Sequence, residues 1–146
     1  MEFQIIQQLI LAIFLGALIG LEREYKGKGA GLQTYSLVCL GACLFTIISL
    51  EMIDFFSSKE LGTSSDIIRI VNAIAIGIGF IGAGVIFRQE SGIIGLTTAA
   101  GLWVTAGIGI SVGAGLYFLA AFSALLSLLV LSGFGLLEDK LLKSKR

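Results

Sequence analysis

Two carboxylates and a guanidinium stand side by side in this chain, at Glu22, Arg23 and Glu24. Carboxylate oxygens suit Mg²⁺, and ionisable side chains at membrane depth usually serve a function. Glu22 and Glu24 are therefore the candidates for a magnesium site, and the sequence indicates no other cofactor. The simpler interpretation is a collar of charges at a membrane boundary, because residues two apart on a helix do not face the same way.

A few other polar residues lie inside apolar stretches. Asn72 predicts either a polar cavity or an interhelical hydrogen bond. We expect Thr97 and Thr98 to bond to backbone or to pack, with a polar site as the alternative. Trp103 falls near the middle of its stretch, which favours packing over an anchor at the membrane interface. The remaining candidate functional residues are Gln33, Thr34 and Arg88.

The composition narrows the class of protein. The chain has 146 residues, of which 56% are hydrophobic and 14% charged, and it contains no histidine. Its mean hydropathy of +0.99 is typical of a membrane protein with several spans. Without histidine no nucleophile–base pair can be assembled, so we do not expect an enzyme. The net charge is zero and the basic residues form no patch, so we expect no nucleic-acid partner.

The elements that must position these residues are long apolar stretches separated by charged or glycine-rich segments. We predict an all-α membrane helix bundle with about five spans, forming one domain over residues 1–146 in contact with the lipid bilayer. The predicted spans are residues 3–21, 35–53, 67–87, 94–110 and 116–137.

The distribution of basic residues predicts the orientation of these spans. Basic residues follow the first span and the third span, and they fill the C-terminal tail. With five spans, an external N-terminus and a cytoplasmic C-terminus, all three groups lie in the cytoplasm, as the positive-inside rule requires. Arg88 is then most simply a topology determinant.

Small residues are expected to mediate close helix packing. The predicted packing glycines are Gly16, Gly20, Gly77, Gly79, Gly82 and Gly84. On the third span we expect the stripe of isoleucines that includes Ile74 and Ile78 to face lipid, and Asn72 to face protein or a cavity. A chain this small is also expected to self-associate, most simply as a dimer.

Four blocks of the sequence resemble, in order, the MgtC/SapB family of bacterial inner-membrane proteins. They are Gly20-Leu21-Glu22-Arg23-Glu24, Gly31-Leu32-Gln33-Thr34, the glycine-rich run 77–86, and Gly95-Leu96-Thr97-Thr98-Ala99-Ala100 with Leu102-Trp103. The resemblance implies a five-span domain in the bacterial plasma membrane. Many relatives carry an additional cytosolic C-terminal domain, whereas this sequence ends at Arg146, so we expect the transmembrane domain alone.

The resemblance also implies a role in adaptation to low magnesium, with restraint of the F-type ATP synthase. We therefore expect a regulatory or interaction protein that acts on another membrane complex. The alternative is a small oligomeric carrier or channel for Mg²⁺ or another cation. Asn72, Thr98, Thr105 and the charges at Glu22–Glu24 would serve it.

Overall fold

The described part of the chain forms five α-helices and one small hairpin. A computed structural model describes residues 2–57, 65–90 and 92–135. The elements are α1 (Glu2–Tyr25), α2 (Leu32–Ser57), α3 (Ser65–Gly84), β1 (Phe87–Gln89), β2 (Gly92–Ile94), α4 (Leu96–Gly113), α5 (Tyr117–Leu128) and the π-helical segment η1 (Leu129–Phe134). The predicted helical membrane fold is confirmed.

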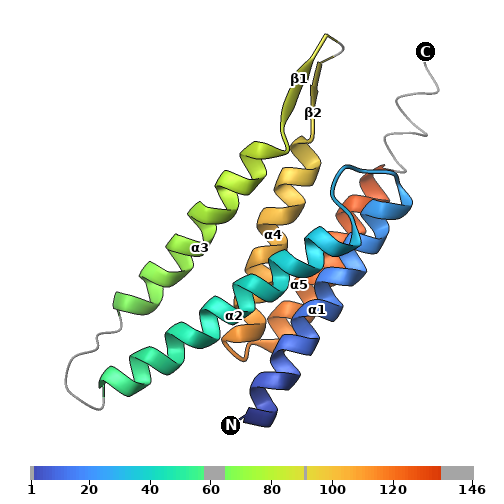
Figure 1. Ribbon diagram of the computed structural model, residues 1–146. Helices are drawn as coiled ribbons and strands as arrows, with labels where there is room; N and C mark the ends of the chain where they lie inside the picture. The colour runs from blue at the N-terminus through green and yellow to red at the C-terminus, as the bar shows by residue number, and fades with distance from the viewer. Residues whose placement is uncertain (1, 58–64, 91, 136–146) are drawn as a thin grey trace.

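Helices α1, α2 and α4 enclose the core, and α5 packs against α4 and α1 (Figure 1). The core side chains are apolar and mostly small, which lets the helix backbones approach closely. Examples are Ala12 and Ile19 on α1, Cys39 and Cys43 on α2, and Ala106 on α4. Both cysteines are free and buried, as small apolar packing residues of a helix bundle are.

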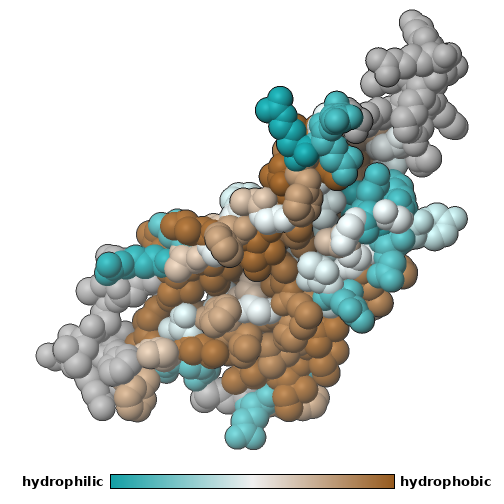
Figure 2. All heavy atoms as spheres, turned by 45° about the horizontal axis from the view of Figure 1, so that its top comes forward, coloured by the Kyte–Doolittle hydropathy of each residue, from teal (hydrophilic) through white to brown (hydrophobic). Residues whose placement is uncertain are grey.

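Four of the helices, α1, α2, α4 and α5 with η1, are long and apolar enough to cross a membrane. The apolar part of α3 is shorter, at Ile68–Gly84. Figure 2 shows hydrophobic side chains over the middle of the bundle, with hydrophilic ones gathered towards its ends. That distribution is what a bilayer requires of a protein that spans it.

The connection between α3 and α4 differs from the prediction. Residues 87 and 94 were assigned to spans, but both belong to an antiparallel hairpin in which Phe87 pairs with Ile94 and Arg88 pairs with Ile93. The helix cannot continue through Gly95, which has φ +90° and stands so close to the Val85 carbonyl that a Cβ would collide with it. The hairpin projects from the end of the bundle that also carries the α1–α2 connection (Figure 1).

The orientation predicted for α3 is wrong. Ile74, Ile78 and Val85 pack against the core, and the isoleucine stripe lines a groove between α2 and α3. Asn72 and Gly79 are exposed. The physical reason is that the large side chains of the isoleucine stripe bury more apolar surface against the core than glycine and alanine would.

Candidate functional site

The carboxylate of Glu22, at the end of α1, is the centre of a polar cluster. Its Oε1 lies 2.6 Å from the Lys26 ammonium and accepts a hydrogen bond from the Ser132 hydroxyl at 3.3 Å. Its Oε2 lies 3.4 Å from Nη1 of Arg23. We call Glu22, Arg23, Lys26 and Ser132 the charged collar. Two cations surround one carboxylate, so this cluster carries a net positive charge.

Lys26 joins α1 to the C-terminal part of the bundle. Its ammonium donates to the carbonyl oxygen of Leu131 at 2.8 Å, inside η1. The hydrogen-bonding pattern of a π-helix departs from the α-helical one, and such segments often occur at functional sites. The side chain of Lys26, the residue directly after α1, therefore holds η1 in place.

Arg23 is almost completely buried, with 3% of its surface exposed. Its Nε is the one buried side-chain nitrogen or oxygen without a hydrogen-bond partner among the residues that the structure describes. A buried unsatisfied donor is costly and calls for an explanation. The charged collar therefore has more donors than acceptors.

Glu24 has a separate structural partner. Its Oε2 accepts from the backbone N–H of Leu32 at 2.8 Å, so it caps the first turn of α2 and complements the helix dipole there. Glu22 and Glu24 thus serve different elements. Within residues 2–57, 65–90 and 92–135 no three side chains of His, Cys, Asp or Glu come together as metal ligands would.

The motif on α4 reaches the interface between α2 and α4. The Tyr35 hydroxyl donates to the carbonyl oxygen of Thr98 at 3.3 Å, and both residues are buried. A Cβ added to Gly101 would lie 2.5 Å from that hydroxyl. The packing of Tyr35 therefore requires a glycine at position 101. Neither residue was predicted from the sequence as a site residue.

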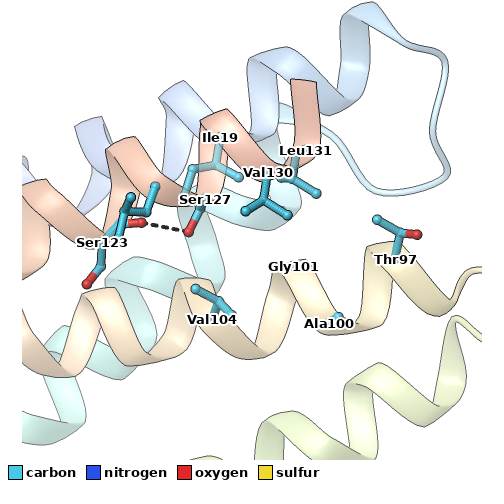
Figure 3. A pocket seen from close by; sticks show the side chains of 10 residues that line it. Ile19, Thr97, Ala100, Gly101, Val104, Ser123, Ser127, Val130 and Leu131 are labelled. Carbon is cyan, nitrogen blue, oxygen red and sulfur yellow. Dashed lines mark hydrogen bonds between the residues drawn. The ribbon is translucent and has the colours of Figure 1, made fainter. Parts of the chain in front are cut away.

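A pocket of about 360 Å³ lies between α4 and α5, with Ile19 of α1 contributing to its wall (Figure 3). Its walls are largely apolar, and its hydroxyls come from Thr97, Ser123 and Ser127. Ser127 donates to the carbonyl oxygen of Ser123, so this hydroxyl is already bonded along its own helix. Leu131, whose carbonyl binds Lys26, also lines the pocket, which links the pocket to the charged collar.

The other predicted site residues are scattered. Gln33 and Asn72 are exposed, Thr34 lines the α2–α3 groove, and Arg88 is exposed on the hairpin. Trp103 was expected to be packed, but 56% of its surface is exposed. It borders a groove lined by α3, α4 and α5, in which Ala75 and Gly107 have too little side chain to cover an indole.

The predicted packing glycines fall into two groups. Added Cβ atoms at Gly16 and Gly20 would lie 2.6 Å and 2.8 Å from backbone oxygens of α2 and the segment before it, and Gly82 meets Ala99 at 3.6 Å. At Gly77, Gly79 and Gly84 an added Cβ meets nothing within 4 Å in the single chain. These last three glycines are therefore not used for packing among the described residues of one chain.

Gln8 makes a buried link between α1 and α4 that was not predicted from the sequence. It is buried, and its side-chain amide donates to the carbonyl oxygens of Val112 and Gly113 at the end of α4. The available signal was a glutamine inside an apolar stretch, since a buried polar side chain must find a partner.

These features define an integral membrane protein: a bundle of apolar helices with buried polar links and a charged collar at one end. The chain belongs to the MgtC family, whose model matches residues 9–140.

Several curated proteins are similar to this chain. YhiD of Escherichia coli strain K12, which is named as a candidate magnesium transporter, is 43% identical over 97% of this chain and 66% of its own length. SapB of Bacillus subtilis is 42% identical over 86% of this chain and 54% of its own length. MgtC of Salmonella typhimurium is 44% identical over 72% of this chain and 41% of its own length. This chain thus spans 41–66% of these relatives. No solved structure matches it.

Proposed function

We propose that this chain is a regulatory protein of the bacterial inner membrane that acts, without catalysing a reaction, by binding another membrane complex during adaptation to low magnesium. The F-type ATP synthase is the first partner to test. We also propose that the N-terminus of this chain lies outside the cell and its C-terminus in the cytoplasm, as the distribution of basic residues indicates.

The observation that carries this proposal is one face of α3. Asn72, Ile76, Gly79, Phe80 and Ala83 recur at helical spacing and are all exposed in the single chain. We call them the open α3 face. An amide in hydrocarbon is costly without a partner, and small residues permit close helix contact. A second membrane helix packed on this face would give the Asn72 amide a hydrogen-bond partner and would make close contact at Gly79 and Ala83.

ATP-driven proton pumping in inverted membrane vesicles tests the proposal. Vesicles from cells that express the chain should pump more slowly than vesicles without it, and Gly79→Leu should restore pumping by blocking the open α3 face. Gly107→Leu is the matched control, because Gly107 is also exposed with free space at its Cβ but lies on α4. Equal pumping with and without the wild-type chain, at confirmed expression, would exclude the ATP synthase as the partner.

In the absence of the partner complex, we propose that the open α3 face binds a second copy of the chain, with a dimer as the simplest form, so that self-association and partner binding exclude each other. A cysteine at Ile76, which is 75% exposed, should crosslink two copies in native membranes. A cysteine at Gly16 should not, because Gly16 is buried against α2.

A cation carrier is the second candidate function, and a polar pocket of about 240 Å³ favours it. The pocket is lined by Gln4, Gln8 and Glu51 together with the turn at residues 113–115. Amide, carboxylate and backbone oxygens there are of the type that hard cations prefer. Mg²⁺ flux into proteoliposomes that Glu51→Gln abolishes would support the carrier over the regulator.

A further inference from the structure

The pocket between α4 and α5 points to a ligand that is apolar along most of its length and anionic at one end. We propose that it binds one anionic phospholipid, with an acyl chain in the pocket and the phosphate at the charged collar. This proposal is independent of the partner complex proposed above.

The length of the pocket fits an acyl chain. It runs along α5 and η1 from Ser123 to Leu131, which is about 12 Å at about 1.5 Å per residue. One leaflet of the hydrocarbon core is about 15 Å thick. The pocket is therefore long enough to receive most of one acyl chain from the leaflet at the collar end.

The walls of the pocket fit hydrocarbon. Val104, Leu126 and Val130 line it and are also exposed at the bundle surface, so the pocket is accessible from the lipid phase. Figure 3 shows Ile19, Val104 and Val130 directed into the space between α4 and α5. Burial of apolar groups against such a surface needs no specific polar contact.

The charge at one end selects an anion. Leu131 and Thr97 both line the pocket, and the Leu131 carbonyl binds the Lys26 ammonium at 2.8 Å. The side chain of Lys26 is partly exposed, at 29%, so it can reach a ligand phosphate. The collar has one more cation than carboxylate, and the unpartnered Nε of Arg23 shows that its donors exceed its acceptors.

The first turn of α4 adds to the positive potential at the collar end of the pocket. It begins after Gly95, which provides no side-chain cap, and Thr97 belongs to it. Free N–H groups at the start of an 18-residue helix favour a negative charge nearby. A phosphate that bridges Lys26 and Thr97 would neutralise the excess charge of the collar and accept from the free N–H groups of α4.

Native mass spectrometry of the purified full chain tests the proposal, with dioleoyl phosphatidylglycerol and dioleoyl phosphatidylcholine as probes. Wild type should retain phosphatidylglycerol about tenfold better. Both lipids carry a phosphate, but the choline ammonium of phosphatidylcholine offsets its charge and would lie beside a collar that already has one excess cation. Ala100→Leu fills the pocket and should remove lipid retention. Ala121→Leu, at an exposed alanine of α5 that does not line the pocket, should not.

Lys26→Gln should bring the two lipids to equal retention, whereas Lys26→Arg should preserve the preference. If Lys26→Gln fails to fold, a photoactivatable phosphatidylglycerol should still crosslink to Val104 or Val130 in wild type. Equal retention of the two lipids by wild type, or unchanged retention in Ala100→Leu, would overturn the proposal. So would equal binding of glycerol 3-phosphate, because a site for free phosphate does not need the pocket.

Discussion

The side-chain amide of Gln8 on α1 lies 3.0 Å from the carbonyl oxygen of Val112 on α4, although 104 residues separate them. The same amide lies 3.2 Å from the carbonyl oxygen of Gly113. Carbonyls at a helix C-terminus lack partners within their own helix, so α1 supplies a donor for them. This contact ties the first helix to the fourth at the end opposite the charged collar.

Gln8→Leu should therefore destabilise the protein. Interhelical hydrogen bonds in membranes contribute about 0.6–2 kcal/mol, and the carbonyl of Gly113 would lose the donor it has in the wild type. Unfolding in mixed micelles would measure the loss. Gln7→Leu, at the exposed neighbouring position, is the control, and equal effects of the two changes would contradict the assignment.

Two glycines on α4 should respond in opposite directions to the same substitution. A Cβ at Gly109 would collide with the Cys39 carbonyl oxygen and lie 2.9 Å from the Cβ of Ala42, whereas one at Gly107 meets nothing within 4 Å. Gly109→Ala should cost about 1–3 kcal/mol through overpacking. Gly107→Ala should gain about 0.5–1 kcal/mol through helix propensity.

Thermal unfolding of the two variants beside wild type checks this pair. A stabilising Gly109→Ala would mean that α2 and α4 are not in the close contact that the structure shows.

Glu22→Gln should lower stability without creating a magnesium effect. Glu22 is bound to Lys26, Arg23 and Ser132, so its loss leaves a buried guanidinium with fewer acceptors. The apparent unfolding temperature of Glu22→Gln should lie below that of wild type. The difference between the two temperatures should be the same in millimolar Mg²⁺ and in NaCl of equal ionic strength. A magnesium-specific stabilisation of wild type that Glu22→Gln loses would instead place an ion at the charged collar.

Cysteines on two faces of α3 should label differently. Gly79→Cys lies on the open α3 face, whereas Gly82 is buried against Ala99 of α4. A lipid-phase maleimide should modify Gly79→Cys well and Gly82→Cys poorly in monomeric micelles. The wild-type chain provides the baseline, since Cys39 and Cys43 are buried. The orientation predicted from the sequence places both glycines towards protein. Poor labelling of Gly79→Cys together with strong labelling of Ile78→Cys would therefore restore it.

The helical membrane fold was predictable because apolar runs of span length allow little else. The face of α4 that carries Thr98, Thr105 and Gly109 was also predictable, since small and hydroxylated residues recurred at helical spacing, and all three are buried. The i,i+4 pair of Glu22 and Lys26 followed from spacing alone.

What could not be predicted depends on contacts between distant parts of the chain. The Glu22 carboxylate accepts a hydrogen bond from Ser132, which is 110 residues away in the sequence, and no local sequence pattern predicts that contact. The orientation of α3 failed for a related reason. A helix wheel separates bulky from small residues, but only the angle between α2 and α3 decides which face turns inward.

The close packing of α4 on α2 has a consequence for biosynthesis. When a ribosome has completed α1 and α2, the faces around Tyr35 and Cys43 still lack the helix that covers them in the folded protein. α4 arrives only after α3 and the hairpin have been made. The nascent α1–α2 pair must therefore remain in the membrane without this cover until α4, which ends at Gly113, has been translated.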